Sequence, residues 1–191
     1  MRKIVFDIET SNLFFDVGTN DPASLELAVV CIYDYERDVY ESYLLEDLPK
    51  LWPIIEKADM LIGYNSDHFD IPLLNKYYSG NLTKIRSLDI LNEIKKSYGR
   101  RMKLDQIAQG TFGASKISNG LEATKWWKQG LKDKVIEYCL QDVKFTKEAY
   151  DYALANQKLI FKEGGKMNII PLNTSHWETK QDSKLTHTLP F

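Results

Sequence analysis

The stretch Phe6-Asp7-Ile8-Glu9-Thr10 decides how the rest of this sequence is interpreted. It lies in an apolar run that is typical of a buried β-strand over residues 2–9. Side chains two positions apart in a strand share a face, so Asp7 and Glu9 point the same way while the apolar residues that alternate with them point into the core. Burying an ionised carboxylate costs several kcal/mol unless a partner compensates it. The strand therefore requires a partner for two carboxylates.

The pattern on either side of this strand predicts an α/β fold, in which helices flank a mixed sheet. Apolar runs at residues 25–33 and 39–45, separated by a turn at 34–38, predict two more strands that form an antiparallel meander with the first. A helix–strand–helix unit follows, and the second half is mostly helical before a closing hairpin. The later predicted elements are a strand at 60–64, a hairpin at 158–170 and helices at 47–58, 68–78, 88–98, 104–111, 121–129 and 132–156.

Length and composition indicate one globular domain. The chain has 191 residues, of which 43% are hydrophobic and 27% are charged, as in ordinary globular proteins. We expect the domain to span residues 1–172 and a polar, loosely ordered tail to occupy residues 173–191. The net charge of −2 carries no basic signature of a nucleic-acid partner, but metal ions would supply positive charge that this count omits.

Two features favour the cytoplasm. Cys31 and Cys139 lack the spacing of a metal site and are typical of buried thiols in a reducing compartment, and nothing near either indicates that they pair. The start of the chain has too short an apolar run for a signal peptide, and no stretch reaches the ~20 apolar residues of a membrane-spanning helix. We therefore expect a cytoplasmic protein with no membrane partner.

Two further segments carry carboxylates that chemistry could use. In Gly63–Leu74, Asn65 ends a predicted strand and Asp70 falls in the first turns of the next helix, where the helix dipole alone would explain it. In Tyr138–Asp142, the first and last residues are four apart and share a helix face. By itself the Tyr138–Asp142 pair fits an ordinary solvated helix face, whereas the helix dipole explains Asp70 better than it explains Phe69 or Asn65.

Together and in this order, the three segments resemble the motifs of 3′–5′ exonucleases of the DEDD superfamily, which have an RNase H-like fold. Phe-Asp-Ile-Glu-Thr matches the first motif, Asn-x-x-x-x-Asp with Phe69 before Asp70 matches the second, and Tyr-x-x-x-Asp matches the third. The resemblance covers roughly residues 1–155. One branch has a His five positions before the last Asp; here that residue is Glu137, so the chain resembles the tyrosine (DEDDy) branch. That branch includes polymerase proofreading domains and stand-alone relatives of the family-B polymerase exonuclease.

The resemblance implies two divalent metal ions, Mg²⁺ or Mn²⁺, which together activate a water and stabilise the leaving oxygen. Asp7 would bridge both ions, Glu9 and Asp142 would complete the tighter site, and Asp70 would act largely through water on the metal. Tyr138 would orient the attacking water. The implied catalytic residues are Asp7, Glu9, Asp70, Tyr138 and Asp142, and the implied substrate contacts are Thr10, Leu13, Asn65 and Phe69.

The implied reaction removes nucleoside 5′-monophosphates from the 3′ end of single-stranded DNA or RNA. Two basic segments are candidates for contacting that strand: Lys95, Lys96, Arg100, Arg101 and Lys103, and then Lys125-Trp126-Trp127-Lys128. Both also fit ordinary helix surfaces. A replication or repair protein is a candidate partner, and Gln157–Phe161 loosely resembles segments that dock on replication clamps, although hairpin packing explains its apolar residues better.

Two alternatives stay open. An RNase H-like endonuclease would leave internal fragments, and a catalytically inactive RNase H-like domain would bind nucleic acid or a partner protein without cutting. The four clustered acids argue against the inactive domain, which has no chemical need for them. Asp89, near a predicted helix start, is expected to cap that helix rather than to support the site.

Overall fold

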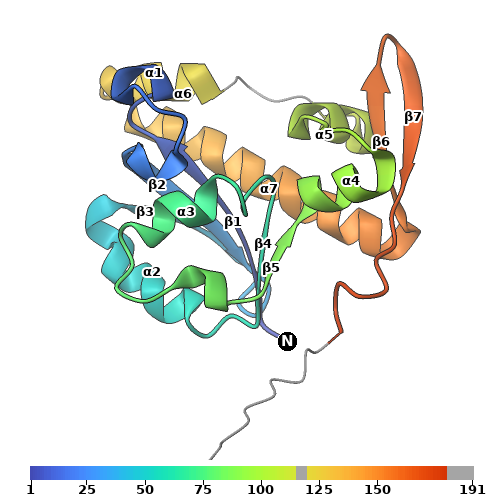
Figure 1. Cartoon of the computed structure of the whole chain (residues 1–191), viewed down its shortest axis with the longest axis horizontal. Helices are drawn as coiled ribbons and strands as arrows, with labels where there is room; N and C mark the ends of the chain where they lie inside the picture. Colours follow the sequence, from blue (N-terminus) through green and yellow to red (C-terminus); the bar gives the residue numbers. More distant parts are fainter. Residues whose placement is uncertain (115–119, 180–191) are drawn as a thin grey trace, which may run out of the picture.

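The computed structural model describes residues 1–114 and 120–179, and a mixed sheet of five strands lies at its centre (Figure 1). The strand order is β3-β2-β1-β4-β5, with β1, β2 and β3 antiparallel and with β4 and β5 parallel to β1. The predicted meander and mixed sheet are confirmed. The strands are β1 Lys3–Thr10, β2 Leu27–Asp34, β3 Val39–Leu44, β4 Met60–Gly63 and β5 Ser87–Asp89.

Helices cover both faces of the sheet. The long helix α7 runs across one face, and α2 and α3 lie on the other (Figure 1). The helices are α1 Phe14–Val17, α2 Leu48–Ile55, α3 Asp70–Asn75, α4 Ile90–Tyr98, α5 Leu104–Phe112, α6 Gly120–Lys128 and α7 Lys132–Asn156, with short 3-10 turns at Pro22–Ser24, Leu45–Asp47 and Leu82–Lys84. A hairpin, β6 Lys158–Glu163 and β7 Lys166–Pro171, packs against α5. In the described part of the chain, no helix combines the length and the apolar character that crossing a bilayer needs.

β1 is buried on both sides because it lies in the middle of the sheet. Ile4, Phe6 and Ile8 pack toward α2 and α3, whereas Val5 packs into the core under α7. Asp7 and Glu9 continue the Val5 face toward the carboxyl end of the strand. The two carboxylates thus occupy positions that would otherwise extend the α7 core.

Several predicted element boundaries differ from the structure, and the helix expected at 47–58 already ends at Ile55. The helix expected at 68–78 is regular only over α3, six residues long. The helix expected from residue 88 begins at Ile90, and Ser87–Asp89 before it form the edge strand β5. A three-residue strand is too short to show a hydrophobic period, which is why the sequence pattern does not reveal it.

The loose order expected from Asn173 is wrong for residues 173–179. Trp177 is fully buried, and its ring stacks on Tyr150 with centroids 5.6 Å apart. Its indole Nε1 donates a hydrogen bond of 3.2 Å to Glu93. Residues 180–191 of the expected tail lie outside the described residues, and the domain boundary at 172 stays a prediction.

Candidate functional site

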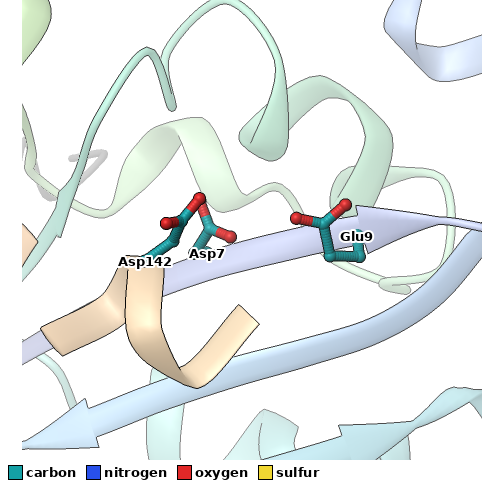
Figure 2. Close-up of side chains that lie close together, drawn as sticks. All are labelled: Asp7, Glu9 and Asp142. Carbon is teal, nitrogen blue, oxygen red and sulfur yellow. The ribbon is translucent and has the colours of Figure 1, made fainter. Parts of the chain in front are cut away.

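Three carboxylates, two from β1 and one from the distant helix α7, meet at the end of β1. One oxygen from each of Asp7, Glu9 and Asp142 lies within 4.8 Å of the others. Figure 2 shows Asp7 and Glu9 on the same side of β1, with Asp142 reaching the pair from α7. Glu9 is 9% exposed and Asp142 is 5% exposed, so little water screens these two carboxylates, whereas Asp7 is half-buried.

Helix α7 brings Tyr138 to the same place. Tyr138 and Asp142 are one helical turn apart and both are buried. The Tyr138 ring lies edge-on to Trp126 of α6, with centroids 6.4 Å apart. Burial and the neighbouring charges of Asp142 and Glu9 raise the pKa of the Tyr138 phenol well above its ordinary value. The phenol therefore keeps its proton and is a hydrogen-bonding group rather than a base.

Asp70 is buried beside the cluster but is not one of the three acids grouped within 4.8 Å. Its Oδ1 accepts a hydrogen bond of 3.1 Å from the backbone N–H of Ile8. The pairing of β1 with β4 ends at Val5, so the backbone N–H of Ile8 has no strand partner on that side. The Asp70 carboxylate accepts its hydrogen bond instead. Burial, with the charges of Asp89 and Asp142, raises the pKa of Asp70 to about 8.

The buried thiol of Cys139 contacts Asp7. The Sγ of Cys139 lies 3.4 Å from the backbone oxygen of Asp7 and 3.7 Å from its Oδ2. Cys31 stands opposite Asp7 in the β1–β2 register, and both cysteines are free and buried. Burial, together with the neighbouring Cys31, raises the pKa of Cys139. The fold thus brings together two cysteines whose association no local sequence feature indicates.

A cavity of about 620 Å³ opens over these residues. Seven of the nine sequence-predicted site residues line it: Asp7, Glu9, Thr10, Leu13, Asn65, Phe69 and Asp70. The other two predicted site residues, Tyr138 and Asp142, are not among the described residues that line it, and Trp126 of α6 packs against the Tyr138 ring.

Local backbone features position the predicted substrate contacts. The β1–β2 register shifts between Glu9 and Thr10, an irregularity of the kind that re-aims side chains next to sites. Asn65 has a left-handed backbone (φ 67°) just after β4 and turns the chain into the cavity wall. Phe69 meets Phe14 edge to face at 6.0 Å, which forms an apolar side of the cavity.

Sequence reasoning missed part of the cavity wall. Helix α6 contributes Leu121 and Thr124 rather than the Lys-Trp-Trp-Lys segment, and Thr124 donates a 3.3 Å hydrogen bond to the Thr10 backbone oxygen. Apart from residues of the apolar core, the missed lining residues are Asn12, Phe14, Tyr64, Leu121 and Thr124. Lys103 also lines the cavity, and it belongs to a basic segment that the sequence already offers as a candidate strand contact.

Asp89 both caps a helix and supports the wall of the site. It caps α4 by accepting hydrogen bonds from the N–H groups of Leu91 and Asn92 at 2.9 and 3.3 Å. It also accepts a 2.8 Å hydrogen bond from the backbone N–H of Asn65. One buried carboxylate therefore anchors both a helix start and the loop that carries a cavity residue.

The donor set fits hard divalent cations. Carboxylate oxygens are the ligands that Mg²⁺ and Mn²⁺ prefer, and Asp7, Glu9 and Asp142 bring three such groups together on rigid elements. Three adjacent carboxylates repel one another without a counter-charge, and a divalent ion would supply it.

Comparisons with known proteins agree with this fold. The family B DNA polymerase from the hyperthermophilic archaeon Pyrobaculum calidifontis matches 81% of this chain at a TM-score of 0.64 and 18% identity. Only 24% of the polymerase chain is covered, so this likeness concerns the fold of one part of it. No curated protein matches the sequence. The sequence profile of the RNase_H superfamily matches residues 4–154, and the mixed five-stranded sheet flanked by helices is RNase H-like. The chain belongs to the RNase_H superfamily.

Proposed function

We propose that this protein is a metal-dependent 3′–5′ exonuclease of the tyrosine branch, which removes nucleoside 5′-monophosphates from single-stranded DNA or RNA. The observation that carries the proposal is the convergence of Asp7, Glu9 and Asp142 within 4.8 Å, with Tyr138 on the adjoining turn of α7. The three motifs are far apart in the sequence, and an unrelated fold would have no reason to bring them together.

Asp7, Glu9 and Asp142 would hold the metal ions, with Asp70 at the side of the cluster. Bound divalent ions supply two kinds of chemistry, a nucleophile at neutral pH and stabilisation of the charge that develops on the leaving oxygen. The Ile8 amide fixes the Asp70 carboxylate, and the Cys139 thiol supports Asp7. These contacts hold the acids in one geometry before substrate arrives.

Tyr138 orients the attacking water in this proposal. Its raised pKa leaves it a neutral phenol, which can donate one hydrogen bond and accept another. A protonated tyrosine cannot take the proton of the water, so in this mechanism its contribution is alignment.

The cavity supports a terminal nucleotide as the bound group. Its volume, about 620 Å³, falls in the usual range for small-ligand sites. Leu13, Phe14 and Phe69 give it an apolar wall against which an unstacked base can lie. This arrangement favours a frayed or single-stranded 3′ end over a paired one.

Labelled oligonucleotides test the proposal. DNA and RNA strands labelled at the 5′ end are incubated with Mg²⁺, with Mn²⁺ and with EDTA. We expect a ladder that shortens from the 3′ end, is absent in EDTA, and is abolished by Asp7→Ala and by Asp142→Ala. Glu137→Gln is the matched control, because Glu137 is an exposed carboxylate beside Tyr138 and outside the cluster.

The same experiment separates the rivals. Internal fragments would indicate an endonuclease, and binding without cleavage in either metal would indicate a catalytically inactive domain. Cleavage in EDTA, or full activity in both alanine variants, would refute the metal mechanism.

Two wider proposals accompany this function. The two free buried thiols suit a reducing compartment such as the cytoplasm. A replication or repair protein is the partner class we propose. Gln157–Phe161, which resembles segments that dock on replication clamps, is not the docking site, because Leu159 and Phe161 are buried in the core.

A further inference from the structure

The basic segment from the last turn of α4 to the start of α5 contains two cations with acidic partners and two beside the cavity. Lys96 pairs with Glu93 at 2.7 Å, and Arg100 pairs with Glu163 at 2.6 Å. Arg101 and Lys103 form no ion pair with any described residue. Arg101 instead donates a 2.6 Å hydrogen bond to the Asn65 side chain, and Lys103 lines the cavity. The sequence presents one patch, whereas the fold pairs Lys96 and Arg100 with acids and places Arg101 and Lys103 beside the site.

The segment that carries Arg101 and Lys103 is held in place. Met102, between them, is buried, and its backbone oxygen accepts a 2.8 Å hydrogen bond from the Tyr64 hydroxyl. The Lys103 N–H donates to the Gln106 side chain at 3.0 Å, where α5 begins. With Met102 turned inward, both neighbouring side chains are exposed on the outer side. The two cations are therefore pre-positioned at the rim rather than carried on a free loop.

The chemistry of the cavity requires such cations. Its described lining includes three acids, Asp7, Glu9 and Asp70, and a single cation, Lys103. Metal ions would neutralise the acids at the scissile phosphate, but a nucleic-acid strand carries a further negative charge at every nucleotide. Arg presents a fork of donors that matches phosphate oxygens, and Lys supplies a point charge.

We propose that Arg101 and Lys103 bind the backbone phosphates on the 5′ side of the scissile bond. They would thereby make the site selective for a polynucleotide strand over an isolated phosphodiester. This inference rests on the proposed exonuclease function and adds the residues that hold the strand. Asn65, which contacts Arg101 and lines the cavity, links the strand contact to the terminal nucleotide site.

Two probes separate strand binding from chemistry. One is a 5′-labelled oligothymidylate, and the other is the p-nitrophenyl ester of thymidine 5′-monophosphate, which has a phosphodiester but no upstream phosphate. For the double variant Arg101→Ala/Lys103→Ala we expect kcat/KM on the oligonucleotide to fall roughly 10- to 100-fold, mostly through KM, with less than about a twofold change on the ester. The dependence of log kcat/KM on log salt concentration should become shallower by about 0.7 for each phosphate that the variant no longer neutralises.

The matched control is Lys96→Ala/Arg100→Ala, which removes the same charge from the ion-paired half of the segment and should leave both rates near wild type. A double variant Arg101→Ala/Lys103→Ala that cleaves the oligonucleotide at the wild-type rate would overturn the inference. An equal fall in rate on both probes would also overturn it, because the residues would then support the fold or the chemistry instead. A wild-type protein inactive on both probes and on the labelled RNA strand would overturn the proposed function itself, and the inference with it.

Discussion

The carboxyl group of Asp70 lies where its ionised form is disfavoured. It is 4% exposed, it faces the negative charges of Asp89 and Asp142, and its pKa rises to about 8 from an ordinary value of 3.8. Burial, with the charges of Asp142 and Glu9, likewise raises the pKa of the Tyr138 phenol and keeps it neutral. Functional sites often combine groups with strongly shifted pKa values, and packing elsewhere in the core must offset the folding free energy that these groups lose.

The raised pKa of Asp70 predicts how the metal-free protein responds to pH. A carboxyl group with a higher pKa in the folded state binds its proton more tightly there, so its stabilising contribution is complete below pH 3.8 and is lost as the pH rises through about 8. In EDTA, Asp70→Asn should therefore melt above wild type at about pH 8, by roughly 2–4 °C for each kcal/mol relieved. Asparagine keeps an oxygen that can accept the Ile8 hydrogen bond.

Thermal melts from about pH 5 to about pH 8 check this prediction, with Glu137→Gln as the control for removal of an exposed carboxylate. The gap between Asp70→Asn and wild type should widen as pH rises and should shrink when Mg²⁺ is added. A variant that melts below wild type throughout this range would contradict it.

Tyr138→Phe tests whether the neutral Tyr138 hydroxyl aligns the attacking water. The substitution removes only the hydroxyl, and the ring can keep its packing against Trp126. We expect kcat to fall roughly 10- to 100-fold, a part of what positioned proton-transfer and hydrogen-bonding groups contribute. The affinity for Mn²⁺, measured by titration, should stay within about twofold of wild type. A large drop in metal affinity would show instead that the hydroxyl supports the acids.

At the scale of elements, close packing of α5 on the hairpin depends on one glycine. Gly110 lies inside α5, where glycine normally weakens a helix. A Cβ at this position would lie 2.4 Å from the Cα of Phe161 in β6. Thr111 next to it exchanges hydrogen bonds with the backbone of Ile160. The glycine thus permits the helix and strand backbones to touch.

Gly110→Ala should therefore destabilise the protein by roughly 1–3 kcal/mol, as overpacking of a core does. On an exposed helix the same substitution would stabilise by about 1 kcal/mol, so the sign of the effect decides between the two roles. Urea unfolding followed by circular dichroism gives the free energy of unfolding. A stabilised variant would mean that α5 and β6 are not in backbone contact.

At the scale of the whole molecule, residues 173–179, at the end of the described chain, contact the first strand β1. Glu178 pairs with Lys3 of β1 at 2.6 Å and accepts a hydrogen bond from Tyr150 of α7. Arg86, just before β5, donates to the backbone oxygens of His176, Trp177 and Thr179. Residues 173–179 therefore join the sheet, α7 and α4 on the side of the core that also carries the acidic cluster.

Trp177→Ala should cost roughly 3–5 kcal/mol of folding free energy, the usual effect of truncating a buried tryptophan. His176→Ala is the neighbouring control. Its side chain is 54% exposed and its pairing with Glu93 lies near the surface, so we expect a change within about 1 kcal/mol. Denaturant unfolding of both variants checks the difference. Equal stabilities would mean that this segment does not belong to the core.

The sequence alone predicted most of the sheet and the composition of the acidic cluster. Period-2 and period-3.6 patterns are local, and they placed β1–β4, α4–α7 and the hairpin within a few residues. The order and spacing of the motifs selected Asp7, Glu9 and Asp142, which the fold brings together. Local pattern could not reveal β5, which is too short to have a period, or the buried position of Trp177 in an otherwise polar stretch.

Tertiary structure alone decided what surrounds the acids. Three features of the site depend on residues far apart in the chain. They are the Ile8–Asp70 hydrogen bond, the contact of Cys139 with Asp7, and the position of Arg101 beside Asn65 rather than beside an acid. These contacts follow from how the elements pack and from which charged groups form ion pairs. Local hydropathy encodes neither the packing nor the ion pairs. Local pattern determined most of the strands and helices and the chemical types at the site, whereas long-range packing determined the distances between the site residues, their burial and hence their pKa values.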